Sequence, residues 1–153
     1  RSGRVAILAT EGTFDGELYS RVVEDFARGT TVSAVTGVGL AALVERGLAG
    51  TPQSGETLQR LLGPEVEAGA DTVVLGCTHY HFLAGDIAAR FPGVEIIDTS
   101  EAVARRAVQV LEDAGARAEA GRTGSLSLIV TGDRAAFDEA MTRLGFVQKV
   151  MEA

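Results

Sequence analysis

The sequence predicts an α/β fold, with a mostly parallel sheet that carries helices on both of its faces. Two observations support this prediction. Short apolar runs, most of them β-branched, alternate along the chain with stretches whose apolar residues recur at helical spacing. Turns rich in Gly, Thr and Pro separate the two kinds of segment. Strands that are separated by helices join through crossovers, and crossovers build parallel sheets.

The first half of the chain is expected to form two strands and three helices. In the first helix, Leu18, Val22 and Phe26 recur every four residues, and Gly29 provides a stop. Pro52 favours the start of the third helix. The expected elements are a strand at 4–9, a turn at 10–13, a helix at 14–27, a strand at 30–35, a helix at 40–48 and a helix that begins after Pro52.

The second half continues the alternation. Asp-Thr-Val-Val-Leu at 71–75 has the pattern of a buried strand, and Pro92–Gly93 interrupts the chain, so an internal boundary is expected near that point. The expected elements are a strand at 71–75, a helix to about Arg90, a strand at 94–97, a helix at 101–114, a strand at 126–130 and a helix at 135–144, with 146–150 as a candidate final strand.

Composition excludes several classes of partner. The chain has 153 residues, a length typical of one domain, or of one domain and part of another. Its 14 Lys and Arg stand against 21 Asp and Glu, and this net charge of −7 argues against nucleic acid or an anionic membrane as the main partner. No apolar run reaches the roughly 20 residues of a membrane span. We also see no signal peptide, so we expect a cytoplasmic protein.

Cysteine usage is minimal. Cys77 is the single cysteine, so the chain has no internal disulfide and no cysteine-built structural zinc site, and we expect no metal. The chain begins with Arg1 rather than Met, and its first strand follows almost at once. We therefore expect a piece of a longer protein.

Two strand ends carry residues suited to chemistry, because ligands of parallel sheets bind beyond the carboxyl ends of the strands. After the first strand, Thr10 and Thr13 bracket Glu11–Gly12 and offer two hydroxyls beside a helix start. Such a place suits a carboxylate or a phosphate. Threonine at a strand-to-helix turn also serves as a helix cap, so the pattern alone leaves both roles open.

The second strand end is Gly76-Cys77-Thr78-His79. A cysteine at a helix start is a candidate thiolate, and His79 could hold or relay a proton near neutral pH. Thr78 offers a hydroxyl as a cap or as a ligand of an anion. The alternative is that Cys77 is a small buried residue and His79 an ordinary turn histidine.

The segment Val-Leu-Gly-Cys-Thr-His-Tyr at 74–80 resembles the second catalytic cysteine motif of glutamate racemase, a member of the cofactor-independent aspartate/glutamate racemase superfamily. Further similar stretches occur in the family's order along the whole chain. They are Ile-Leu-Ala-Thr-Glu-Gly-Thr at 7–13 with Tyr19, Leu-Val-Glu-Arg-Gly at 43–47, Asp-Thr-Ser-Glu-Ala at 98–102, Val-Thr-Gly-Asp-Arg at 130–134 with Phe137, and Leu-Gly-Phe at 144–146.

The resemblance implies interconversion of L- and D-glutamate without a cofactor, for peptidoglycan precursor synthesis in bacteria. Cys77 would exchange a proton on one face of the substrate carbon, and His79 would assist that proton. Glu45 matches the family's active-site glutamate. Thr10, Thr13 and Thr78 would bind the substrate.

It also implies that the chain is a fragment, inactive alone. Residues 1–92 would form the second domain of a two-domain racemase, and 93–153 would complete the first domain, whose N-terminal half carries the other cysteine. We therefore expect either a homo-oligomer or pairing with that missing half. His81 stands where the family usually has proline. Asp98 and Ser100 are expected mainly to cap a helix.

Two other functions stay open at this point. A single-cysteine enzyme of the same superfamily, such as a decarboxylase or an isomerase, would use Cys77 alone. A non-catalytic module that binds carboxylates would not need the thiol at all.

Overall fold

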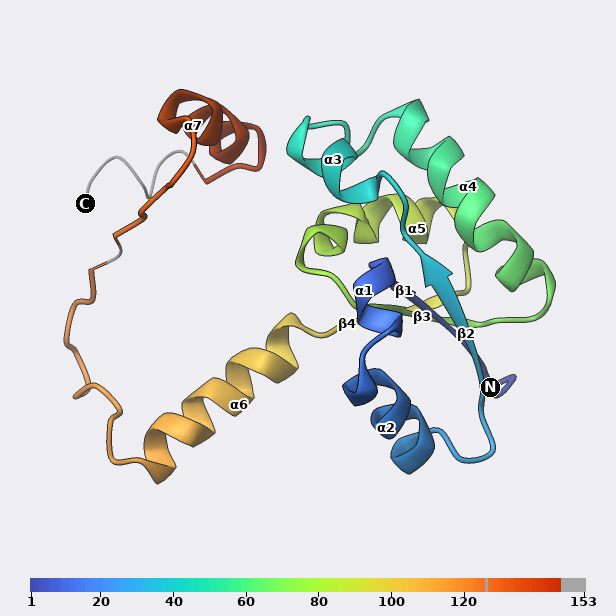
Figure 1. Cartoon of the computed structure of the whole chain (residues 1–153), viewed down its shortest axis with the longest axis horizontal. Helices are drawn as coiled ribbons and strands as arrows, with labels where there is room; N and C mark the ends of the chain where they lie inside the picture. The colour runs from blue at the N-terminus through green and yellow to red at the C-terminus, as the bar shows by residue number, and fades with distance from the viewer. Residues whose placement is uncertain (126, 147–153) are drawn as a thin grey trace. The chain divides into compact units, whose positions relative to one another are not determined.

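The computed structural model describes residues 1–125 and 127–146, and its centre is a four-stranded sheet (Figure 1). All neighbouring strands are parallel, and their order across the sheet is β2-β1-β3-β4. This confirms the predicted α/β fold. The strands are β1 (Arg4–Ala9), β2 (Thr31–Thr36), β3 (Thr72–Leu75) and β4 (Glu95–Asp98).

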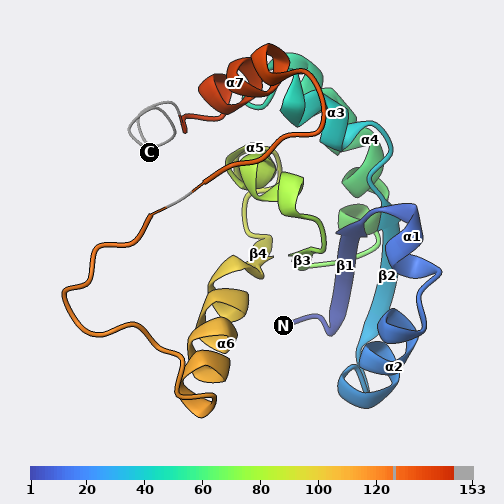
Figure 2. The same ribbon diagram turned by 60° about the vertical axis from the view of Figure 1, so that its left-hand side comes forward.

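The helices connect or follow the strands, and Figure 2 shows α1 and α2 in the connection between β1 and β2. None of the helices in the described part of the chain is long and apolar enough to cross a membrane. They are α1 (Glu11–Phe14), α2 (Glu17–Phe26), α3 (Leu40–Glu45), α4 (Pro52–Glu67), the 3₁₀ helix η1 (Thr78–Leu83), α5 (Ala84–Arg90), α6 (Ser100–Asp113) and α7 (Arg134–Arg143).

The direction of strand addition reverses at β1. The chain moves from β1 outward to β2 and then returns to the other side of β1 to form β3 and β4. Because parallel crossovers are right-handed, this reversal places α2 and α4 on opposite faces of the sheet. Figure 1 shows this arrangement, with α5 on the same side as α4. Helices therefore lie on both faces, as expected.

The core lies between the sheet and the helices α4, η1 and α5. Side chains alternate in direction along a strand, so every second residue of β1 and β3 points into this layer. The register pairs Ala6 with Val73 and Leu8 with Leu75, so the same rows face the helices. The fully buried apolar residues here are Ala6, Leu8, Leu58, Leu62, Val73, Leu75, Leu83 and Ile87.

The other face of the sheet is covered less completely. Leu18, Val22 and Phe26 form the predicted stripe on α2, but 75%, 47% and 82% of their surfaces are exposed. On β4, Ile97 is 42% exposed. Most of the buried apolar packing of the sheet is therefore on the face covered by α4 and α5.

Several expected boundaries differ from the observed ones. Glu11–Phe14 forms a single helical turn where a turn at 10–13 was expected, and α2 begins only at Glu17, after Gly16. No strand occurs at 127–130 within the described residues, since an extended run forms a strand only beside a partner. Residues 126 and 147–150 of the two predicted C-terminal strands lie outside the described residues, and Phe146 is not in a strand.

Contacts divide the chain into two units. One contains Arg1–Val44 and Leu48–Ser100, and the other contains Glu45–Gly47 and the described residues after Ser100. β4 therefore belongs to the first unit, although it lies beyond the boundary expected near residues 91–93. In the second unit, the carboxylate of Asp133 caps α7 by accepting hydrogen bonds from the N–H groups of Ala135 and Ala136. The assignment of residues 93–153 to another domain of a longer protein stays a prediction.

We predict that Leu58→Ala lowers the free energy of unfolding by about 2–5 kcal/mol, because it empties space in the layer between α4 and the sheet. Urea denaturation of the two chains would measure the loss. Leu18→Ala is the matched control, since Leu18 is 75% exposed, and it should change the free energy by less than about 1 kcal/mol. Equal effects of the two substitutions would contradict this account of the core.

Candidate active site

The carboxyl ends of β1 and β3 meet at the point where strand order reverses, which is the usual ligand position in an open parallel sheet. The N–H of Gly76 donates a hydrogen bond to the carbonyl of Leu8 over 2.9 Å, so the two strands stay paired to their last residues. A Cβ on Gly76 would lie 2.9 Å from the Cβ of Ala9. Glycine at this position lets the two chains leave the sheet side by side.

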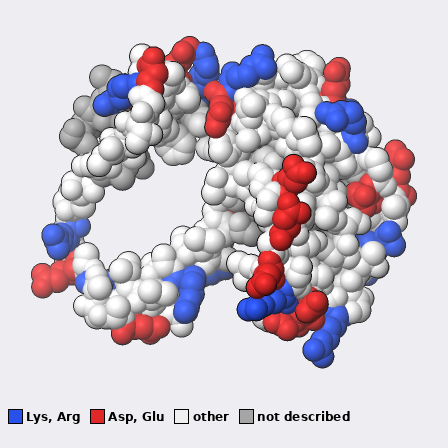
Figure 3. Space-filling view, viewed as in Figure 1, with Lys and Arg blue, Asp and Glu red and all other residues white. Residues whose placement is uncertain are grey.

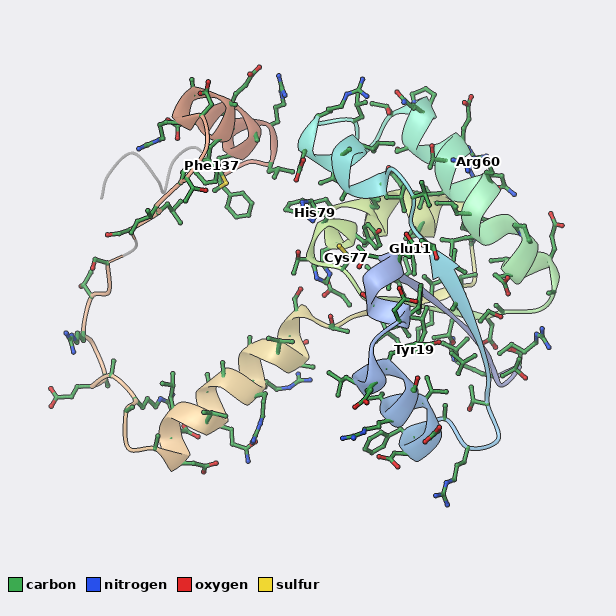
Figure 4. All side chains as sticks on the ribbon, viewed as in Figure 1. Glu11, Tyr19, Arg60, Cys77, His79 and Phe137 are labelled. Atoms are coloured by element: carbon green, nitrogen blue, oxygen red, sulfur yellow. The ribbon has the colours of Figure 1, made fainter. Side chains whose placement is uncertain are left out.

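Cys77 and His79 lie together in the loop after β3. Cys77 has an extended backbone at the cap position of η1, and its side chain is half-buried. Its Sγ lies 3.8 Å from Nδ1 of His79 (Figure 4). A thiol and an imidazole at this distance form a pair that can share or exchange a proton.

Thr10 and Thr13 lie together just after β1, at the cap position of α1 and within that helix. Their hydroxyl oxygens are 3.0 Å apart. Thr10 occupies the cap position of α1, but its side chain makes no capping hydrogen bond. The two hydroxyls therefore bond to each other at the exposed edge of the sheet, next to the loop that carries Cys77.

A pocket of about 380 Å³ opens beside the end of β1, between β1, β2 and the start of α3. Most of its wall is apolar, and its polar groups come from Thr10, Glu11 and Thr36. Gly37 and Tyr80 complete the wall toward the Cys77 loop. Its size is within the usual range for a small-molecule site.

Acidic side chains lie near this edge. Figure 3 shows them along α1 and the start of α2, where Glu11, Asp15 and Glu17 are exposed. Of these, Glu11 lines the pocket and brings negative charge to it, whereas Glu17 forms an ion pair with Arg21. A ligand with an ammonium group would gain from this charge, whereas the backbone phosphates of a nucleic acid would be repelled.

The structure does not bring every predicted residue into this cluster. Thr78 is the first residue of η1, is exposed, and follows rather than occupies the cap position. Glu45 is the last residue of α3, has an exposed side chain, and belongs by its contacts to the second unit. Their roles in substrate binding and catalysis stay predictions.

His81 and Asp98 connect the Cys77 loop with the end of β4. Nδ1 of His81 lies 2.9 Å from Oδ1 of Asp98, but this contact does not have the geometry of a hydrogen bond. The same carboxylate oxygen accepts a hydrogen bond from the N–H of Ser100 at the start of α6, so the predicted capping role of Asp98 is confirmed. This hydrogen bond is the main cause that lowers the pKa of Asp98, and His81 lowers it further.

Tyr80 and its partner Gly37 lie near the site but were not assigned a role from the sequence. Tyr80 is buried, and its hydroxyl donates a hydrogen bond to the carbonyl of Gly37 over 3.1 Å. The signal in the sequence is an aromatic residue within a polar loop, but its partner lies 43 residues away.

Across residues 1–125 and 127–146, no group of three or more His, Cys, Asp or Glu side chains could hold a metal ion.

These features define an α/β protein with a thiol–imidazole pair at the switch point of a parallel sheet. Residues 1–107 match the Asp/Glu/Hydantoin racemase family. A glutamate racemase of Deinococcus radiodurans is 42% identical over 138 residues, which are 88% of this chain and 48% of that protein. The chain therefore belongs to the Asp/Glu/Hydantoin racemase family.

Solved structures of glutamate racemases are similar to this chain along most of its length. A glutamate racemase from Thermus thermophilus in complex with β-chloro-D-alanine is 32% identical, with a TM-score of 0.78 over 96% of this chain and 55% of that one. Escherichia coli glutamate racemase, in complex with L-glutamate and the activator UDP-MurNAc-Ala, is 27% identical, with a TM-score of 0.73 over 96% of this chain and 57% of that one. The chain thus spans about half the length of the relatives it matches.

We predict that Asp98→Asn makes the fold less sensitive to acid. A carboxyl whose pKa is lowered on folding stabilises the folded state above its ordinary pKa of 3.8, and this stabilisation is lost as the pH falls through the lowered value. Urea unfolding at about pH 5 and about pH 2.5 would show a smaller loss of stability in the variant. Asp15→Asn, at an exposed position, is the control. The same acid sensitivity in wild type and Asp98→Asn would contradict the prediction.

Proposed function

We propose that the chain is part of a glutamate racemase, which removes the proton from the α-carbon of glutamate and returns it on the opposite face. One observation carries the proposal: Cys77 Sγ lies 3.8 Å from His79 Nδ1 at the edge where β1 and β3 end together. Membership of the racemase family supports the reaction class. The names of the relatives, and L-glutamate in the Escherichia coli complex, support the substrate.

In the proposed mechanism, Cys77 works on one face of the substrate. Its thiolate takes the α-proton in one direction, and its thiol returns a proton in the other. His79 exchanges a proton with the sulfur, so the thiolate can be restored between turnovers. Cys77 is the single cysteine of the chain, so the second thiol of this two-thiol mechanism would come from the rest of a longer protein.

The binding groups are assigned by their position and chemistry. We propose that Thr10 and Thr13 bind a substrate carboxylate through their hydroxyls, whose oxygens lie 3.0 Å apart. Thr78 would contribute its hydroxyl or its N–H group. Glu45 would tune the site, as the matching glutamate does in the family.

The wider biology follows from the reaction. D-glutamate made by the longer protein would supply peptidoglycan synthesis in the cytoplasm of a bacterium. Residues 93–153 would complete its other domain, and the active form would be this pair of domains or a homo-oligomer of it.

The presence of one cysteine favours a second candidate, a single-thiol isomerase or decarboxylase of the same superfamily. In such an enzyme Cys77 would protonate one face only, and the product would have one handedness. A carboxylate-binding module without catalysis would tolerate the loss of Cys77.

The test is racemisation of each glutamate enantiomer in D₂O by the longer protein. We predict that Cys77→Ala lowers kcat by about 10²- to 10⁴-fold, because one of the two acid/base groups is lost. Arg60→Gln, on the exposed side of α4, is the control and should keep the wild-type rate. The chain of residues 1–153 should show little or no turnover by itself.

Substantial turnover by Cys77→Ala would contradict the proposal. Product of one handedness only, with deuterium incorporated, would favour the single-thiol enzyme. Unchanged glutamate binding by Cys77→Ala, together with an inactive wild-type protein, would favour the binding module.

A further inference from the structure

Tyr80 joins the ends of three strands. Its N–H donates a hydrogen bond to the carbonyl of Cys77 over 3.0 Å, just after β3. Its hydroxyl donates to the carbonyl of Gly37 over 3.1 Å, just after β2. The N–H of Gly37 in turn donates to the carbonyl of Ala9, the last residue of β1, over 2.9 Å. A chain of three hydrogen bonds therefore runs from the Cys77 loop to β2 and β1.

The ring of Tyr80 and the backbone of Gly37 also fit closely together. Only 1% of the Tyr80 surface is exposed. A Cβ on residue 37 would lie 2.3 Å from the Tyr80 hydroxyl oxygen and 2.6 Å from Cζ, so the ring keeps its position only while residue 37 is glycine. Burial raises the pKa of Tyr80 to about 12, so its hydroxyl remains a donor throughout the physiological range.

We propose that Tyr80 is a positioning residue that holds the Cys77 thiol against His79. The turn from Cys77 to Tyr80 carries both reacting groups, and the Tyr80 side chain is the part of this turn that reaches across to β2. Because the same ring lines the pocket beside Thr10, it also fixes that pocket relative to the thiol. The inference rests on the proposed function, in which Cys77 and His79 move the proton.

Packing alone would not produce this role. A tyrosine that only fills the core lowers stability when it is changed, but it leaves the Cys77–His79 pair unaltered in molecules that remain folded. If Tyr80 positions the pair, the effect of His79 on the reactivity of Cys77 depends on Tyr80. If Tyr80 only fills the core, that effect does not depend on Tyr80. A double-mutant cycle measures that dependence.

The experiment is alkylation of the chain with iodoacetamide, followed by mass spectrometry at several pH values from about 6 to about 9. Since the chain has one cysteine, the rate reports Cys77 alone. The variants are His79→Ala, Tyr80→Phe and the double variant. Gly37→Ala is added as a further background, with and without His79→Ala. It displaces the Tyr80 ring by a collision with the new Cβ, whereas Tyr80→Phe removes only the hydroxyl. Circular dichroism selects conditions in which every variant is folded.

We expect His79→Ala to change the alkylation rate about threefold or more in the wild-type chain, and by less than about 1.5-fold when Tyr80→Phe or Gly37→Ala is present. Tyr19→Phe is the matched control, since Tyr19 is the other tyrosine and meets Phe14 edge to face, and it should leave the His79 effect unchanged.

Equal effects of His79→Ala in every background would overturn the inference, as would no effect in the wild-type chain. Alkylation requires no turnover, so this outcome is separate from the racemisation test. If alkylation shows coupling between Tyr80 and His79 but the longer protein does not racemise glutamate, the positioning role stands and the proposed function is rejected.

Discussion

The close approach of three strand ends is the constraint on which the rest of the candidate site depends. Gly76 pairs with Leu8, and Gly37 pairs with Ala9, through hydrogen bonds that continue the sheet past its formal ends. Both glycines lie where a side chain would collide with a neighbour, Ala9 in one case and Tyr80 in the other. Without this approach, the loops after β1 and β3 would leave the sheet further apart, and no compact site would form between them.

The core supports this arrangement from one side only. Leu58 and Leu62 of α4 and Ile87 of α5 are fully buried near β1 and β3, so the two central strands are fixed on that face. The opposite face carries the exposed stripe of α2 and the exposed Ile97. The site thus stands on the better-packed strands of the sheet, where a thiol, an imidazole and two hydroxyls can keep a fixed geometry.

Part of the site could be predicted from local pattern. The run Gly-Cys-Thr-His-Tyr follows a strand, so the sequence alone places Cys77 and His79 at a carboxyl edge, and the two residues are neighbours because they share one turn. Thr10 and Thr13 are three residues apart, and their mutual hydrogen bond is likewise local. The partner of Tyr80 could not be predicted in this way, because Gly37 lies 43 residues away and no spacing rule connects them.

The sequence by itself determined the α/β class, the four strands of the sheet and the two strand ends that carry reactive groups, because these depend on residue order and local periodicity. It failed at 127–130, where an apolar run has strand character but no strand forms, since a strand exists only when another backbone accepts its hydrogen bonds. Tertiary structure decided the strand order β2-β1-β3-β4, and with it which loops share an edge. That order comes from the packing of helices on two faces, a property of the whole chain that no local segment contains.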